Sequence, residues 1–193
     1  MNLGVLGGFA QADTSVWEFR RAVEGVRVYE APAGDLKRVR LRATIDGTVP
    51  QILALLDSVQ HYPDWVYRTT ESRIIDYRAD TLRYYTRTDF PWPLQDRDFV
   101  LDSWIERPSD TLVISRSRAR TPFARSPVRD AVRVVHFESD WYLTPLAGGK
   151  TRVDYYLRTD PGGSIPAWIS NIALERGPLK LVAAFRERLR ALR

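Results

Sequence analysis

Hydrophobic and polar residues alternate cleanly over residues 38–45 (RVRLRATI), where every second side chain is apolar. This alternation predicts a half-buried β-strand, with its apolar side chains on one face and its arginines on the solvent face. Further strand-like segments, separated by short turns, lie at 26–29, 72–78, 81–89, 97–106, 111–119, 130–143 and 151–158. Because strands joined by short turns pair antiparallel, the pattern predicts one antiparallel sheet of about seven strands.

Three other segments have apolar residues spaced three to four apart, which is typical of amphipathic helices. They are residues 16–23, residues 49–59 after the candidate N-cap Thr48, and a C-terminal segment of roughly 26 residues. In the C-terminal segment Pro166 suits the first helical turn. Gly177-Pro178 predicts a kink there, because proline removes a backbone donor and crowds the preceding turn.

These elements predict an α+β fold in which a curved antiparallel sheet wraps around the long C-terminal helix. The helix must bury its apolar stripe and the sheet its apolar face, and packing one on the other satisfies both. A strongly twisted sheet does not seal flat against one helix, so the space between them becomes either packed core or an internal cavity. No linker or repeat divides the chain, and we expect a single domain over residues 15–193.

Residues 1–14 are expected to form an N-terminal tail. The stretch 2–9 is apolar and small, and Ala10-Gln11-Ala12 fits the pattern of a secretory cleavage site, although no basic residue precedes it. Two interpretations follow: the remnant of an export signal, which implies the periplasm, or an ordinary N-terminus of a cytoplasmic protein.

Composition narrows the candidate chemistry. The chain has no cysteine, which excludes disulfides, thiolate zinc sites and a cysteine nucleophile, and its two histidines lie far apart. We therefore expect no metal and no cofactor. Of 29 basic residues 26 are arginines, and the net charge is +5. Because the arginines are scattered singly, a solvated surface or attraction to anionic lipid is favoured over nucleic acid.

The sequence contains none of the common catalytic motifs. His136, Glu138 and Asp140 alternate on one strand and could share a face as a general-base group, but a polar strand face is the preferred interpretation. Asp96 and Asp98 flank Arg97, which favours a structural ion pair over a catalytic carboxylate pair.

Two stretches resemble the hallmark segments of START domains, the steroidogenic-acute-regulatory-protein-related lipid-transfer domains, in a bacterial-type member. They are residues 91–100 (PWPLQDRDFV) and residues 160–171 (DPGGSIPAWISN). Trp17, residues 25–29 (GVRVY) and residues 63–65 (PDW) are similar to earlier landmarks of the family, in the same order.

The resemblance implies a helix-grip fold, a tunnel that holds one lipid, a gate formed by the C-terminal helix, and no catalysis. Sterol-binding members carry a buried acid–base pair, and the matching positions here are Tyr84 and Ser103, neither of them charged. Their hydroxyls could instead contact a polar head group. Gly162-Gly163 and Gly177-Pro178 are candidate hinges for the gate.

Large side chains spread over the sheet and the last helix are the predicted cavity wall. The predicted ligand-binding residues are Tyr84, Phe99, Trp104, Trp141, Tyr155, Trp168, Ile169, Ile172, Val182 and Phe185. Phe99 and Trp104 stand on opposite faces of a regular strand, so without a bulge one of them points away. The predicted partner is a lipid or other apolar small molecule, with transient membrane contact through arginines of the last helix. Those arginines are Arg176, Arg186, Arg188 and Arg190.

Two other functions remain alternatives. An enzyme of the wider helix-grip superfamily, a cyclase or hydrolase acting on a hydrophobic substrate, would need a titratable pair inside the cavity, such as His136 with a carboxylate. An interaction module would instead have a filled core and no cavity.

Overall fold

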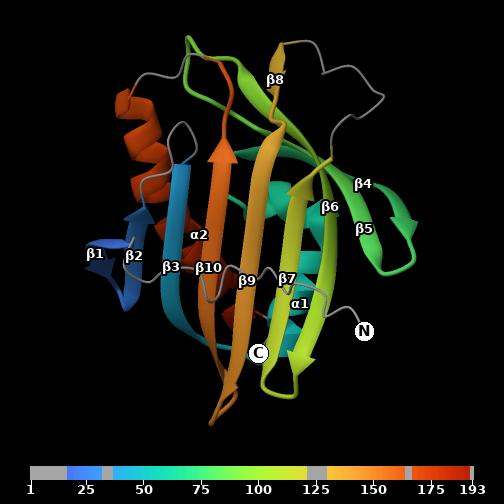
Figure 1. Ribbon diagram of the computed structural model, residues 1–193, viewed down its shortest axis with the longest axis vertical. Helices are drawn as coiled ribbons and strands as arrows, with labels where there is room; N and C mark the ends of the chain where they lie inside the picture. The colour runs from blue at the N-terminus through green and yellow to red at the C-terminus, as the bar shows by residue number, and fades with distance from the viewer. Residues whose placement is uncertain (1–16, 32–36, 121–129, 164–166, 192–193) are drawn as a thin grey trace, which may run out of the picture.

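The computed structural model describes residues 17–31, 37–120, 130–163 and 167–191. Within these ranges, ten strands form one curved sheet with helices on its inner side (Figure 1). The strands are β1 (Glu18–Val23), β2 (Val26–Ala31), β3 (Lys37–Asp46), β4 (Thr69–Arg78), β5 (Thr81–Thr88), β6 (Asp96–Ser109), β7 (Leu112–Ala119), β8 (Ala131–Arg133), β9 (His136–Leu146) and β10 (Lys150–Asp160). The helices are α1 (Val49–Asp57), the 3-10 helix η3 (Val59–Asp64) and α2 (Ala167–Ala191).

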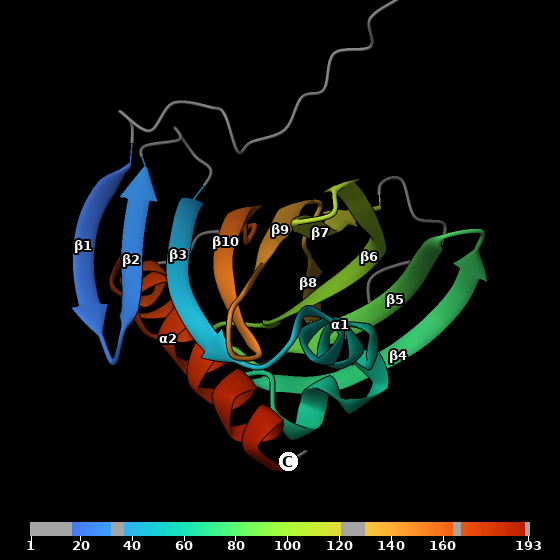
Figure 2. The same cartoon turned by 90° about the horizontal axis from the view of Figure 1, so that it is seen from below.

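The strands follow the order β1-β2-β3-β10-β9-β7-β6-β5-β4 in space. Neighbours along this path pair antiparallel, whereas the short β8 lies parallel to β6. Figure 2 shows the sheet as an arch, with α2 running across its open side and α1 beside it. This arrangement confirms the predicted α+β helix-grip fold.

The main core lies where α2 meets the centre of the sheet. The alternating residues Val39, Leu41, Ala43 and Ile45 of β3 are all buried, as their pattern predicted. From α2, buried residues at three- to four-residue spacing pack on them: Val182, Phe185 and Leu189. Burial of side chains of this size supplies most of the energy that holds helix to sheet.

The far end of α2 sits very close to the turn after β3. A Cβ atom at Gly47 would lie 2.9 Å from Cδ1 of Leu189, closer than carbon atoms pack. Glycine is therefore favoured at this position, because any larger residue would force the Leu189 side chain to shift. The next residue, Thr48, begins α1, and its backbone N–H donates to Gln51 Oε1 at 2.8 Å, which supports the predicted N-cap.

The helix predicted over residues 16–23 is wrong, because residues 18–23 form the edge strand β1. Glu24 and Gly25 both have positive φ angles and close a two-residue hairpin, in which Val23 pairs with Val26. The register shifts between Phe19 and Arg21, so apolar residues do not alternate regularly along β1. The irregular spacing of the apolar residues therefore resembles the apolar stripe of a helix.

The single strand predicted over 130–143 is two strands. Residues 131–133 pair with β6 as β8, the chain then shifts at Val134 and Val135, and β9 begins at His136 between β7 and β10. The predicted loop over 122–127 and the predicted tail over 1–14 lie outside the described residues. α2 is one continuous α-helix that includes Gly177-Pro178.

The outer face of the sheet carries cross-strand rows of opposite charge. One row runs Arg158, Glu138, Arg118, Asp102 and Arg83 across five strands in register. Arg83 Nε lies 2.6 Å from the Asp102 carboxylate, and Arg158 Nη1 lies 3.6 Å from that of Glu138. Many of the scattered arginines are therefore structural, since opposite charges on facing strands stabilise the pairing.

Candidate functional site

A cavity of about 210 Å³ lies between the inner face of the sheet, η3 and α2. The cavity is one of the two outcomes that the predicted fold allowed, and it argues against the alternative of an interaction module with a filled core. Its described wall has an apolar part and a hydroxyl-bearing part. The apolar part comprises Leu56, Trp65, Val66, Phe99, Leu101, Phe137, Trp141, Leu181 and Phe185. The hydroxyl-bearing part comprises Tyr62, Thr69, Tyr84, Thr86, Thr88, Ser103, Ser115, Ser117, Ser139 and Tyr155.

Aromatic rings build the apolar part around Phe185 of α2. The Phe185 ring lies 4.8 Å from that of Trp65, nearly perpendicular to it, and 5.1 Å from that of Trp141. Trp141 in turn packs on Tyr155 of the neighbouring strand, with ring centroids 4.4 Å apart. Contacts of this kind between aromatic rings are favourable, and they hold these large side chains in place along the cavity wall.

The tyrosine hydroxyls of the wall are held in their neutral form. Burial raises the pKa of Tyr84 to about 12, although the hydroxyls of Ser117 and Tyr62 act in the opposite direction. Burial likewise raises the pKa of Tyr155, against the effect of Ser139. The neutral Tyr84 phenol contributes stability below pH 10 that is lost as pH rises towards 12, because its folded pKa exceeds the unfolded value of 10.0.

Five of the predicted ligand-binding residues line the cavity: Tyr84, Phe99, Trp141, Tyr155 and Phe185. They come from four strands and α2, so the fold brings together residues up to about half the chain apart. Ser103, matched to Tyr84 through the family resemblance, also lies in the wall. Trp168, Ile169 and Ile172 fall in the first part of α2, where side chains lie outside the described residues.

Two predicted wall residues lie elsewhere. Trp104 projects from the outer face of β6, where its indole N–H donates to Glu106 Oε1 at 2.9 Å and the Arg118 guanidinium covers its ring. β6 is regular between Phe99 and Trp104, so their opposite parity puts one side chain in the cavity and the other outside. Val182 is buried in the main core and does not reach the cavity wall.

Apart from Ser103, sequence reasoning missed the small hydroxyl residues of the wall. Ser117 stands between Arg116 and Arg118, and Ser139 between Glu138 and Asp140, so both look like residues of solvent-exposed strands. A usable signal was present in their spacing, because Ser139 has the same parity as Trp141 on β9 and must share its face.

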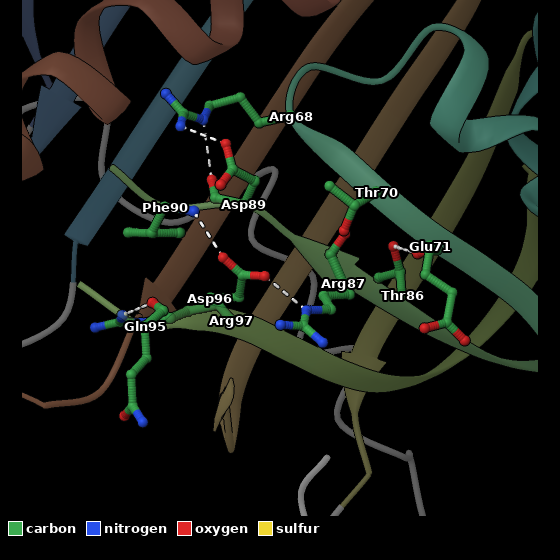
Figure 3. Close-up of polar contacts among 10 residues, drawn as sticks. All are labelled: Arg68, Thr70, Glu71, Thr86, Arg87, Asp89, Phe90, Gln95, Asp96 and Arg97. Atoms are coloured by element: carbon green, nitrogen blue, oxygen red, sulfur yellow. Dashed lines mark hydrogen bonds and ion pairs between the residues drawn. The ribbon is translucent and has the colours of Figure 1, made fainter. Parts of the chain in front are cut away.

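The loop between β5 and β6 is braced at its base (Figure 3). The Asp96 carboxylate accepts hydrogen bonds from Arg87 Nε at 2.6 Å and from the Phe90 backbone N–H at 3.2 Å. Arg68 pairs with the Asp89 carboxylate and donates from Nε to its carbonyl oxygen at 3.0 Å. These contacts give Asp96 the structural role that the sequence predicted.

Arg97 joins this loop to the turn that precedes α2. Its guanidinium is buried and donates to three carbonyl oxygens, those of Pro161 at 2.9 Å, Gly162 at 2.8 Å and Gln95 at 2.5 Å. Burial lowers the pKa of Arg97. Gly162 and Gly163 both have φ near +68°, a conformation that side-chain-bearing residues rarely adopt, so the turn depends on these glycines.

The candidate catalytic groups lie away from the cavity. His136, Glu138 and Asp140 share the outer face of β9, where Asp140 pairs with Arg116 at 3.0 Å. His136 is exposed, so this group does not form the titratable pair that the enzyme alternative requires inside the cavity. Within the described ranges, the side chains hold no cluster suited to a metal ion, and no helix has the length and apolar character to cross a bilayer.

Comparison with known proteins identifies one family. The START domain model matches residues 10–193. An uncharacterized protein of Pseudomonas aeruginosa is 29% identical over 185 residues, which span 95% of this chain and 90% of that protein. The phosphatidylcholine transfer protein of Mus musculus is 25% identical over 174 residues, or 83% of this chain and 78% of that protein.

A solved structure shows the same fold. The STAR-related lipid transfer protein of Xanthomonas axonopodis superimposes with a TM-score of 0.82 at 24% identity, covering 91% of this chain and 99% of that chain.

Proposed function

From the premise that this chain belongs to the START domain family, we propose that it binds one lipid molecule in the cavity between sheet and α2 and acts without catalysis. The observation that carries the proposal is the wall itself, in which aromatic and aliphatic side chains face hydroxyls and the described residues contribute no charge. Two similar proteins are a STAR-related lipid transfer protein and a phosphatidylcholine transfer protein, which supports a lipid as the ligand here.

The affinity would come from burial of hydrocarbon. Each buried CH₂ group contributes about 0.8 kcal/mol, so one acyl chain could supply on the order of 10 kcal/mol before the costs of ordering. We further propose that the ligand enters by displacement of the N-terminal part of α2, with the Gly162-Gly163 turn as hinge.

Native mass spectrometry of the gently purified chain tests the binding proposal, with organic extraction of any bound molecule. We expect one lipid per chain. Ser117→Phe, which fills the cavity, is expected to abolish retention, whereas Ser109→Phe in the exposed β6–β7 hairpin should retain it. A chain that carries no lipid and takes up none from vesicles would contradict the proposal.

Arg97→Ala is expected to accelerate lipid exchange about tenfold or more. The substitution removes three charge-assisted hydrogen bonds, each worth about 1.5–3 kcal/mol, and so releases the turn before α2 from the β5–β6 loop. Stopped-flow release of a fluorescent fatty alcohol measures the rate. Arg73→Ala, in an exposed pair with Glu71, serves as control, and an unchanged rate in Arg97→Ala would rule out this turn as the latch.

Two of the arginines predicted to dock on a membrane hold the helix to the protein. Arg186 donates to the carbonyl oxygens of Glu24 at 2.8 Å and Thr44 at 3.3 Å, and Arg188 donates to that of Asp64 at 3.0 Å. We therefore place the proposed membrane contact elsewhere, at Trp92.

Trp92→Ala is expected to slow transfer between vesicles several-fold and to leave lipid affinity unchanged. Trp92 is 89% exposed on the β5–β6 loop, which leaves the cavity wall at Thr88, and tryptophan favours the bilayer interface. A vesicle-to-vesicle transfer assay measures the rate. Tyr77→Ala, a similarly exposed ring in β4, is the matched control, and equal transfer rates for both variants would refute this contact.

A further inference from the structure

We infer that the polar part of the ligand is uncharged and carries hydroxyl or carbonyl oxygens, held by a row of serines on the inner face of the sheet. This inference rests on the proposed function, since it names the class of lipid that the same cavity takes. The serine row is defined as Ser103 of β6, Ser117 of β7 and Ser139 of β9.

The serine row crosses three neighbouring strands in register. Ser103 pairs with Ser117, and Ser117 pairs with Ser139, and all three line the cavity. The Ser117 hydroxyl lies 3.3 Å from that of Ser103. Because adjacent strands lie about 4.8 Å apart, the row spans roughly 10 Å and offers several donors and acceptors to one bound group.

Two tyrosines adjoin the row without adding charge. Tyr84 interacts with Ser117 and Tyr155 with Ser139, and burial keeps both phenols neutral. The Tyr62 hydroxyl already donates to the carbonyl oxygen of Leu56 at 2.6 Å, so it has no proton left to donate to a ligand. A buried hydroxyl is stabilised by each hydrogen bond that it makes, and a ligand oxygen placed along the row would provide a further hydrogen-bond partner.

The charges next to the row in sequence face the other way. Arg116 and Arg118, on either side of Ser117, both bind the Asp140 carboxylate on the outer face, at 3.0 and 2.7 Å. Asp102, next to Ser103, pairs there with Arg83. A phosphate or ammonium group on the serine row would thus have no counter-charge from these neighbours. Burial of an unpaired ion costs several kcal/mol, whereas a neutral oxygen needs hydrogen bonds alone.

Three probes with the same oleoyl chain test the inference on the chain of residues 1–193: monooleoylglycerol, oleate and lysophosphatidylcholine. One-chain probes are chosen because a cavity of about 210 Å³ leaves no room for a second acyl chain. Competition against a fluorescent fatty alcohol gives their relative affinities. We expect monooleoylglycerol to bind at least about tenfold more tightly than the two charged probes, in line with the cost of burying an unpaired ion.

The double variant Ser117→Ala/Ser139→Ala is expected to bind monooleoylglycerol about 25-fold more weakly, since it loses two hydrogen bonds and each is worth about fivefold. Its affinity for 1-octadecene, which has no polar group, should not change, and Ser109→Ala outside the cavity should alter neither. Equal or tighter binding of a charged probe would overturn the inference and leave lipid binding intact. Failure of every probe, including 1-octadecene, would instead count against the proposed function.

Discussion

Asp98→Ala is expected to lower the free energy of unfolding by about 3–5 kcal/mol, the usual cost of removing one partner from a buried ion pair. Asp98 is 0% exposed, and its carboxylate accepts two hydrogen bonds from Arg133, from Nε and Nη2, both at 2.8 Å. Arg133 belongs to β8, and the next residue, Val134, donates its backbone N–H to the Asp98 carbonyl oxygen. The variant would leave a guanidinium without its carboxylate and weaken the attachment of β8 to β6.

Urea unfolding followed by tryptophan fluorescence measures this loss. Glu71→Ala is the control, because its pair with Arg73 is about half exposed on both sides and should change stability by less than about 1 kcal/mol. A loss below 1 kcal/mol for Asp98→Ala as well would show that the buried pair contributes nothing measurable. The conspicuous acid–arginine–acid segment of this chain would then need a role other than structural support.

Phe185→Ala is expected to destabilise the ligand-free chain by about 3–5 kcal/mol. The side chain is 0% exposed and contacts both Trp65 and Trp141, so its removal deletes ring contacts and leaves a void. Phe185 also lines the cavity, so the void left by its side chain would merge with the cavity. Neighbouring side chains could then fill little of the enlarged space.

Thermal and urea unfolding with and without added lipid measure the effect. Phe185→Leu keeps most of the volume and should cost about 1 kcal/mol, while Phe19→Ala on the exposed edge strand should cost less than that. If lipid binds in the cavity, saturating lipid should restore more stability to Phe185→Ala than to Phe19→Ala. Equal restoration in the two variants would place the ligand away from Phe185.

The parts of the fold that were predicted correctly are those in which local pattern and tertiary burial agree. β3 buries Val39, Leu41 and Ile45 on one face because its alternation has the period of a strand. The edge strand β1 was misread as a helix, because one irregular step near Phe19 and Arg21 removed that period. The family resemblance, which rested on motifs separated by many residues, is confirmed by the match over residues 10–193.

The cavity was harder to predict than the fold, because parity alone does not say which face of a strand is inside. From the sequence, Phe99 and Trp104 were equally good candidates for the cavity wall. Only the way in which the sheet curves around α2 shows that Phe99 lies inside and Trp104 outside. The serines of the wall were hidden by their neighbours. A serine between two arginines looks solvent-exposed. In a strand, however, Ser117 faces away from both arginines, which pair with Asp140 on the opposite face.

If α2 moves as proposed, its far end, which packs on Gly47 through Leu189, would act as the pivot. Arg186 and Arg188 tie the same end to backbone carbonyls, so any displacement of the helix has its largest amplitude at the opposite end, beside Gly162. The proposed motion would open the cavity beside the Gly162-Gly163 turn, for loading and unloading alike. A lipid carried inside would not turn over, so the end that entered last would be the first to leave.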